Sequence, residues 1–489
     1  MVVAANPGAA RTATITVAGQ VHTVRQALLP HYLVSSVAHA PGAAGTKWRS
    51  DFAAVNRGAA AADLTLTFWP YGSGDGVVKQ HTLASGATVE WKDVLVSLFE
   101  QTATSVKGSV QVDASAPVQI SLRTYNQATE GTYGQGYPAV TTGEALAAGV
   151  VGVIPQLAKS AALRTNVGVL NVGAADVAVA IKLFTAAGVQ AGTTKEATVA
   201  PARYWQQDDI FTATGAGALE GAYATVEVLT AGGRVWAYAS VIDNGTGDPT
   251  TVPVQFAVPA GPYLVSSQAH LKGAGGTQWR SSLAVVNTGA AEAALTLTYR
   301  PYGTGDAVVR DHALAPGASV EWHDVLVSLF GQDAAANVKG SVEIASPQPV
   351  VVGARTYNQA AKGTYGQDYP AIAAAQALLA GQVGVLPQLR KDAATRTNVG
   401  VLNVGAADVA VEVQLFDATG AEVGVATAAS VAAGRYWQQD DIFTSSGAGA
   451  QAIAYATVEV KTPGGAVWAY ASVIDAATGD PTTIPVLLQ

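Results

Sequence analysis

The segment Leu64-Thr65-Leu66-Thr67-Phe68 alternates apolar and polar residues, and it returns as Leu295-Thr296-Leu297-Thr298-Tyr299. Because side chains alternate between the two faces of a strand, this pattern predicts a strand with one buried face. Similar runs recur about every ten to fifteen residues between Gly, Asn, Asp and Pro turns, and no βαβ alternation is visible. The sequence therefore predicts an all-β fold and disfavours a Rossmann or barrel enzyme.

The two copies belong to a long internal repeat. Tyr32–Ala40 (YLVSSVAHA) returns as Tyr263–Leu271 (YLVSSQAHL), at a spacing of 231 residues. After one inserted residue the spacing becomes 232, and Arg203–Phe211 (RYWQQDDIF) returns unchanged at Arg435–Phe443. The chain therefore contains a duplication of about half its length.

A weaker similarity divides each half again, because WRSDFAAVNRGAA from Trp48 resembles LRTNVGVLNVGAA from Leu163. We therefore expect four tandem immunoglobulin-like β-sandwich modules in the order A1-B1-A2-B2, preceded by a two-strand N-terminal hairpin. The corresponding segments are the hairpin (1–27), A1 (28–140), B1 (141–258), A2 (259–372) and B2 (373–489). In A1 we expect one short helix around Asp93–Phe99, with Asp93 as its N-cap.

The joints between the segments are short. One lies near 140–150 and another near 258–263, and neither reads as a flexible tether. We therefore expect a semi-rigid rod of modules.

Composition narrows the classes of function. Lys and Arg number 27 against 35 Asp and Glu, a net charge of −8, which argues against a nucleic-acid or anionic-membrane binder. The chain has no Cys, which excludes disulfides, thiolate metal sites and a Cys nucleophile. Charged residues are only 13%, which leaves a weakly polar surface suited to packing against identical neighbours.

No targeting segment is expected. The chain has no apolar run long enough for a transmembrane helix, so we expect a protein that does not span the membrane. Its first residues, MVVAANPGAAR, lack the basic and apolar regions of a signal peptide. The sequence therefore leaves two alternatives, an intracellular chain or a secretion signal that lies outside this sequence.

Residues 1–27 match none of the four segments. They predict two strands, Thr12–Val17 and Gln20–Gln26, around a turn at Ala18-Gly19. An isolated hairpin is barely stable in water. It either packs on A1 or is a leftover of a truncated precursor, or it supplies strands to a neighbouring subunit. Such a contact would build a head-to-tail filament. The subunit-contact candidates are Thr14, Ile15, Val17, Val21 and Val24.

This hairpin resembles the C-terminal hairpin of the BACON-type immunoglobulin-like domain of secreted bacterial proteins. The matching residues are Asn6, Gly8, Arg11, Thr14-Ile15-Thr16, Gly19-Gln20 and Val24-Arg25-Gln26. The four segments resemble tandem β-sandwich repeats of large secreted bacterial surface proteins, with WR-(S/T)-(D/N) and TGDP-type signatures. The resemblance of the hairpin to the BACON-type domain implies secretion and a surface role facing carbohydrate or mucin, whereas the repeats carry no assigned activity.

Two acidic loops are candidates for a calcium site. Asp243-Asn244-Gly245-Thr246-Gly247-Asp248 and its copy, residues 475–480, offer carboxylates and carbonyls, with Asp243, Asp248, Asp475 and Asp480 as possible ligands. The alternative is an Asx-type turn between two strands, which favours the same residues. We expect no other cofactor.

Aromatic and basic residues offer further candidates. A sugar-binding face or core packing could each explain the nine tryptophans, at 48, 69, 91, 205, 236, 279, 322, 437 and 468. Arg49, Arg164, Arg280 and Arg396 occupy one position in all four segments, which favours a structural role on loop carboxylates or carbonyls.

Catalytic signatures are missing. The chain has no HExxH pair and no GxSxG elbow, so we expect no catalytic residues and no enzyme. We expect an extracellular or cell-surface structural protein that self-assembles into a filament or stalk. The alternative is an adhesin or carbohydrate-binding surface protein that recognises a glycan or host-surface ligand.

Overall fold

The computed structural model of the chain describes residues 11–17, 20–26, 30–256 and 261–488. Across these residues the protein is nearly all β, with antiparallel strands in seven sheets. Four single-turn α-helices interrupt the strands: α1 (Val94–Ser97), α2 (Ile210–Thr214), α3 (Val325–Ser328) and α4 (Ile442–Ser445). No helix in these ranges is long and apolar enough to cross a membrane.

Segments A1 and A2 each form one continuous sheet, because the first strand pairs with β8 or β26 along most of its length and with β4 or β22 at its end. The strands of A1 are β3 (His31–Pro41), β4 (Lys47–Val55), β5 (Ala62–Pro70), β6 (Val77–Leu83), β7 (Thr88–Trp91), β8 (Val106–Ala114), β9 (Gln119–Gln127) and β10 (Thr132–Pro138). Those of A2 are β21 (Tyr263–Lys272), β22 (Gln278–Asn287), β23 (Ala293–Pro301), β24 (Val308–Leu314), β25 (Ser319–Trp322), β26 (Val338–Ala345), β27 (Val350–Ala360), β28 (Gly363–Asp368) and β29 (Ile372–Ala373).

Segments B1 and B2 each contain two separate five-stranded sheets. The strands of B1 are β11 (Leu146–Ala147), β12 (Val151–Lys159), β13 (Leu163–Asn171), β14 (Val177–Phe184), β15 (Gln190–Val199), β16 (Tyr204–Gln207), β17 (Leu219–Val228), β18 (Arg234–Asp243), β19 (Pro249–Pro253) and β20 (Gln255–Phe256). Those of B2 are β30 (Leu378–Leu379), β31 (Val383–Lys391), β32 (Thr395–Asn403), β33 (Val409–Phe416), β34 (Glu422–Val431), β35 (Tyr436–Gln439), β36 (Gln451–Val460), β37 (Ala466–Asp475), β38 (Pro481–Pro485) and β39 (Leu487–Leu488).

The alternating segments form strands as predicted. Leu64–Phe68 lies inside β5 and Leu295–Tyr299 inside β23. Leu64, Leu66 and Phe68 are fully buried, because the apolar face of β5 packs into the core of A1. The prediction of an all-β fold is therefore confirmed.

The short helix of A1 also forms, and Asp93 lies at its N-cap position. Its side chain makes no capping hydrogen bond to α1. Instead, one carboxylate oxygen lies 2.7 Å from His39 Nδ1 and 3.4 Å from Arg49 Nε. Asp93 therefore occupies the N-cap position as expected, but its side chain does not cap the helix, because its carboxylate contacts groups on β3 and β4 instead.

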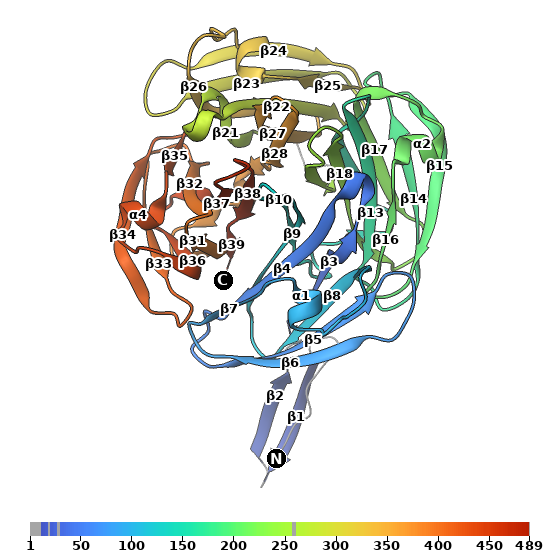
Figure 1. Ribbon diagram of the computed structural model, residues 1–489, viewed down its shortest axis with the longest axis vertical. Coiled ribbons are helices and arrows are strands. Elements are labelled where there is room, and N and C mark those ends of the chain that lie inside the picture. Colours follow the sequence, from blue (N-terminus) through green and yellow to red (C-terminus); the bar gives the residue numbers. More distant parts are fainter. Residues whose placement is uncertain (1–10, 18–19, 27–29, 257–260, 489) are drawn as a thin grey trace.

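The four segments close into a ring rather than extending as a rod. Figure 1 shows them around a common centre, with β10, β28 and β38 innermost. The last segment meets the first, because Thr132 and Gly134 donate backbone N–H bonds of 2.9 and 3.0 Å to Asp475 and Asp480. The rod expectation is wrong because short joints fix the spacing of neighbours and not the direction in which the chain turns.

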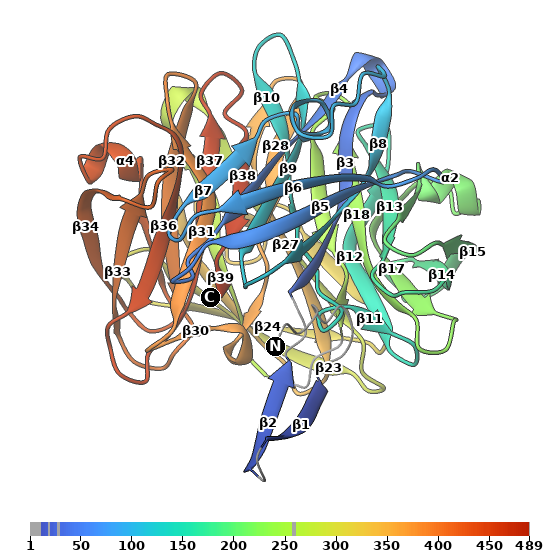
Figure 2. The same cartoon turned by 90° about the horizontal axis from the view of Figure 1, so that it is seen from below.

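The N-terminal strands form as predicted. β1 (Arg11–Val17) and β2 (Gln20–Gln26) pair in a two-stranded sheet of their own, apart from the ring in both views (Figures 1 and 2). The predicted turn at Ala18-Gly19 and the start of the joint at residue 258 lie outside the described residues.

Candidate functional site

Each junction between successive segments holds a cavity, and the cavities are of two kinds. Two lie where an A segment meets the B segment that follows it, with volumes of about 290 Å³ at A1–B1 and 210 Å³ at A2–B2. The other two lie where a B segment meets an A segment, with about 310 Å³ at B1–A2 and 200 Å³ at B2–A1. We call these the A–B cavities and the B–A cavities.

The two A–B cavities present the same side chains twice. Every polar or aromatic residue that lines the A2–B2 cavity has an identical counterpart at A1–B1. The pairs are Ser36 and Ser267, Trp48 and Trp279, Lys107 and Lys339, Thr124 and Thr356, Tyr137 and Tyr369, Arg164 and Arg396, Asn166 and Asn398, Tyr204 and Tyr436, Gln206 and Gln438, Asp208 and Asp440, and Ser240 and Ser472.

The B–A cavities lack this identity. Ala158 and Ser282 at the B1–A2 junction stand where the B2–A1 junction has Arg390 and Asp51. Both kinds of junction hold segments together, so the shared architecture alone does not explain why only the A–B cavities keep their polar and aromatic lining unchanged.

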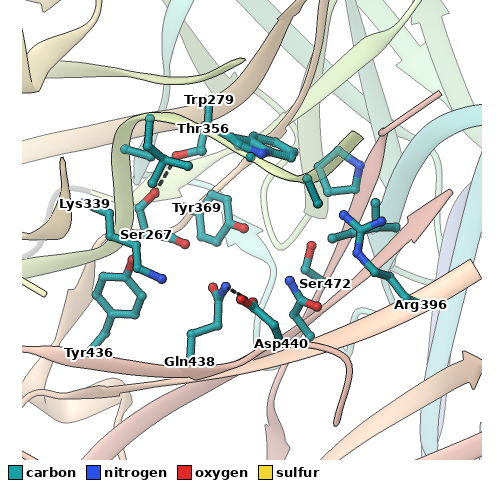
Figure 3. A pocket seen from close by; sticks show the side chains of 17 residues that line it. Ser267, Trp279, Lys339, Thr356, Tyr369, Arg396, Tyr436, Gln438, Asp440 and Ser472 are labelled. Carbon is teal, nitrogen blue, oxygen red and sulfur yellow. Dashed lines mark hydrogen bonds between the residues drawn. The ribbon is translucent and has the colours of Figure 1, made fainter. Parts of the chain in front are cut away.

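Aromatic rings form one part of the A–B wall. In the A2–B2 cavity, Tyr369 and Tyr436 are buried, and Trp279 is half-buried (Figure 3). Gly273 lets the indole approach, because a Cβ there would lie 2.5 Å from Trp279 Nε1. Burial raises the pKa of Tyr436 well above its usual value, so its hydroxyl stays protonated and can donate a hydrogen bond.

A chain of hydrogen bonds fixes the polar groups of the same cavity. Ser267 Oγ lies 3.0 Å from the Tyr470 hydroxyl, which donates a 2.9 Å bond to Gln438 Oε1. Gln438 Nε2 then donates a 2.7 Å bond to Asp440 (Figure 3). The chain orients an exposed carboxylate at the cavity mouth, where its remaining lone pairs face solvent or a ligand.

Two cationic side chains complete the wall. Lys339 Nζ lies 4.1 Å from the centre of the Tyr302 ring, a cation–π contact that fixes its position. Burial lowers the pKa of Lys339, whereas the nearby Asp440 opposes this shift. Arg396 extends from β32 on the other side of the cavity (Figure 3). The wall therefore offers donors, acceptors and aromatic faces together.

The four acidic residues proposed for calcium lie at the B–A junctions, where they accept hydrogen bonds. Asp243 accepts a 2.9 Å bond from Thr364 N, and Asp248 accepts a 2.8 Å bond from Gly366 N. Asp475 and Asp480 repeat these contacts with β10. The described part of the chain contains no group of three or more His, Asp or Glu side chains placed to hold a metal ion.

The tryptophan and arginine candidates divide between two roles. Trp48 and Trp279 line the A–B cavities, whereas Trp236 is buried and stacks on Tyr238 with ring centres 5.3 Å apart. Arg49 and its copy Arg280 have the structural role predicted: each donates a 2.7 Å bond to the carbonyl of the preceding Trp. Arg164 and Arg396 instead line the A–B cavities.

The subunit-contact candidates lie on the N-terminal sheet. Thr14, Ile15 and Val17 are on β1, and Val21 and Val24 are on β2. The structure describes the backbone pairing of these residues, including Thr14 with Thr23, and their side chains lie outside what it describes.

Sequence reasoning did not single out Tyr204, Gln206 or Asp208 as site residues. All three lie in RYWQQDDIF, the nine-residue stretch that the two halves share unchanged. Exact retention of a polar and aromatic stretch within a diverged repeat was the signal that could have identified them.

Comparisons with known proteins give no family. No protein-family model matches the chain, and no curated protein matches it. Among solved structures, Thermotoga maritima 1070 is similar at 16% identity and a TM-score of 0.20, over 23% of this chain and 94% of that one. An alpha-L-rhamnosidase of Streptomyces avermitilis, complexed with L-rhamnose, has 9% identity and a TM-score of 0.14, over 90% of this chain and 57% of that one. Similarities this weak carry no argument about function.

Proposed function

We propose that the protein is a non-enzymatic carbohydrate-binding protein with two equivalent sites, the A–B cavities, in a ring of four immunoglobulin-like modules. The observation that carries this proposal is the identity of the polar and aromatic lining in both copies, beside B–A cavities that have diverged. With the resemblance to secreted bacterial repeats, it supports a role at the cell surface.

The chemistry of the wall fits a sugar. A pyranose presents C–H groups on its faces and hydroxyls around its rim. Trp279 and Tyr436 offer apolar faces, while Asn398, Gln438 and Asp440 offer paired donors and acceptors. Volumes of 210 and 290 Å³ fall below the about 300–1,000 Å³ typical of drug-sized ligands, so each cavity suits one or two sugar units.

A glycan array followed by calorimetric titration tests this proposal. We expect a glycan that binds the native protein at two sites per chain. Trp48→Ala should leave one site and the double variant with Trp279→Ala should leave none, because each substitution removes one stacking face. Each loss should weaken local affinity at least about tenfold, or about 1.4 kcal/mol.

Trp91→Ala is the matched control. Trp91 is half-buried in A1 and lies edge-on against His81, with ring centres 5.0 Å apart, outside the A–B cavity. It should keep both sites. Equal losses in the control and cavity variants, or no saturable binding of any glycan, would contradict the proposal.

A second candidate function is head-to-tail assembly through the N-terminal sheet. It is supported by one observation: among the described strands, β1 and β2 pair only with each other. Two strands are a marginal unit in water, and a neighbour's edge strand would extend them. Deleting residues 1–27 should then abolish fibres seen by electron microscopy, and fibres that persist without them would exclude this role.

A further inference from the structure

The two B–A cavities share a glutamine–glutamate hydrogen bond but differ in the charged residues around it. At B2–A1, Gln388 Nε2 donates a 3.0 Å bond to Glu90, and at B1–A2, Gln156 Nε2 donates a 3.2 Å bond to Glu321. These pairs occupy equivalent positions in the repeat. Each B–A junction therefore places one glutamate beside its cavity. The charged residues around the two equivalent glutamates can be compared directly.

At B2–A1 the protein supplies its own cation. The Arg390 guanidinium forms an ion pair with Glu90, and its Nη2 lies 3.9 Å from an Asp51 oxygen. The side chains of Glu90 and Asp51 are each 4% exposed and that of Arg390 is 12% exposed. A buried carboxylate without a partner is costly, so the arginine stabilises this junction.

At B1–A2 that cation is missing. Ala158 stands in place of Arg390, and Ser282 in place of Asp51. Glu321 remains and is 10% exposed; a mostly exposed His323 lies 3.7 Å away. The cavity is correspondingly larger, 310 Å³ against 200 Å³.

The other charges around this cavity do not replace the arginine. Glu220 adds a second carboxylate where the copy has Ala452. Arg355 also lines the cavity, but it donates a 2.6 Å bond to Thr250 and lies 3.8 Å from Asp248. The B1–A2 cavity therefore keeps the glutamate that its copy pairs with Arg390, lacks that arginine, and has Glu220 in addition.

We propose that the B1–A2 cavity binds a guanidinium group supplied by a ligand, seated beside Glu321 where the copy places its own Arg390. The ligand is a small guanidinium compound or the arginine side chain of a peptide. This site is separate from the A–B cavities, so it stands or falls independently of carbohydrate binding.

Methylguanidinium chloride is the probe, used with the full chain in calorimetric and thermal-shift titrations. Measurements are made at a series of pH values, because burial raises the pKa of the Glu321 carboxyl and a guanidinium group binds its ionised form. We expect one saturable site per chain and a rise in Tm with ligand. Tetramethylammonium chloride, which cannot donate hydrogen bonds, should give no saturable effect at equal ionic strength. Arginine amide and an arginine dipeptide distinguish a free compound from a peptide.

Three variants test the position of the site. Ala158→Arg should abolish binding because it copies the filled junction, and Glu321→Gln should weaken binding at least tenfold. Arg390→Ala should open a second site, so that the stoichiometry rises to two and methylguanidinium restores part of the lost Tm. Absence of saturable binding to the native chain, or binding unchanged in Ala158→Arg, would overturn the proposal.

Discussion

Gly168, on β13, lies so close to the ring of Tyr238 that a larger side chain would clash with it. A Cβ there would lie 2.3 Å from the ring of Tyr238, and Gly400 meets Tyr470 in the same way. Tyr238 is fully buried, and its hydroxyl lies 3.1 Å from both Ser36 Oγ and Gln206 Oε1 in the A1–B1 cavity. The missing side chain therefore lets a core residue reach the candidate site.

Gly168→Ala should lower the free energy of unfolding by about 1–3 kcal/mol, because the added methyl overpacks a buried ring. Gly143→Ala is the control, since its nearest neighbour would be Thr141 Oγ1 at 3.8 Å. Urea denaturation of both variants measures the difference. Equal stability of the two variants would contradict the role assigned to the close approach.

At the scale of single residues, the sequence predicted which kinds of contact a residue makes better than it predicted which distant residue it contacts. The shared position of the four arginines predicted the structural contacts of Arg49 and Arg280, whereas Arg164 and Arg396 line the A–B cavities. The role of Gly168 was not predictable, because nothing local marks a strand glycine that faces a ring 70 residues away.

Among the elements, the first long strand of each segment carries a bulge. Ser36, Gln156, Ser267 and Gln388 have φ values of 63, 62, 58 and 57° on β3, β12, β21 and β31, each at a break in the strand register. Each of these side chains lines one junction cavity. The bulges turn a strand residue out of its sheet and into the junction.

The positive φ of Ser36 implies backbone strain, and substitution at this position tests it. A non-glycine residue in the left-handed region costs about 1–2 kcal/mol, and a β-branched residue is the least tolerated there. Ser36→Val should therefore lower the free energy of unfolding by more than about 1 kcal/mol relative to Ser36→Gly. Urea denaturation makes the comparison, and a valine variant as stable as the glycine variant would show that the bulge relaxes.

Strands were predictable where one face of the sheet is buried and the other is more exposed, as in Leu64–Phe68, because the sequence then alternates apolar and polar residues. The bulges were not predictable, because Ser and Gln carry no local preference for positive φ. The single sheets of A1 and A2 were not predicted either, because they depend on the bulges. In A1, β3 pairs with β4 only after its register shifts between Val34 and Val37.

The whole molecule depends on a hub where β10 and β28 meet the carboxylates of the B segments. Gln135 Nε2 donates a 3.1 Å bond to Gly366 O, and Gln367 Nε2 returns a 3.1 Å bond to Gly134 O. Asp248 and Asp480 accept the N–H groups of those glycines. The repeat was visible in the sequence, but closure joins residues up to 398 positions apart, as in the hydrogen bond from Arg57 to Tyr455, and no local pattern encodes such a contact.

The hub also predicts how stability depends on pH. Burial raises the pKa of Asp248 to about 8, and it raises that of Asp480 well above its usual value. In the unfolded chain these carboxyls ionise near pH 4, at a pKa of about 3.9. Between the two values the folded chain binds more protons than the unfolded chain, so the free energy of unfolding falls as pH rises through this window.

Thermal unfolding across this window should therefore show Tm decreasing toward about pH 8 in the native protein. Asp248→Asn should flatten the decrease without abolishing it, because Asp480 and Asp368 still titrate. Burial raises the pKa of Asp480 well above its usual value and that of Asp368 to about 8. The amide oxygen of Asn can still accept the Gly366 N–H, so the variant tests charge rather than hydrogen bonding. A native Tm that rises over this window, or an unchanged slope in the variant, would mean that the hub carboxylates are ionised in the folded ring.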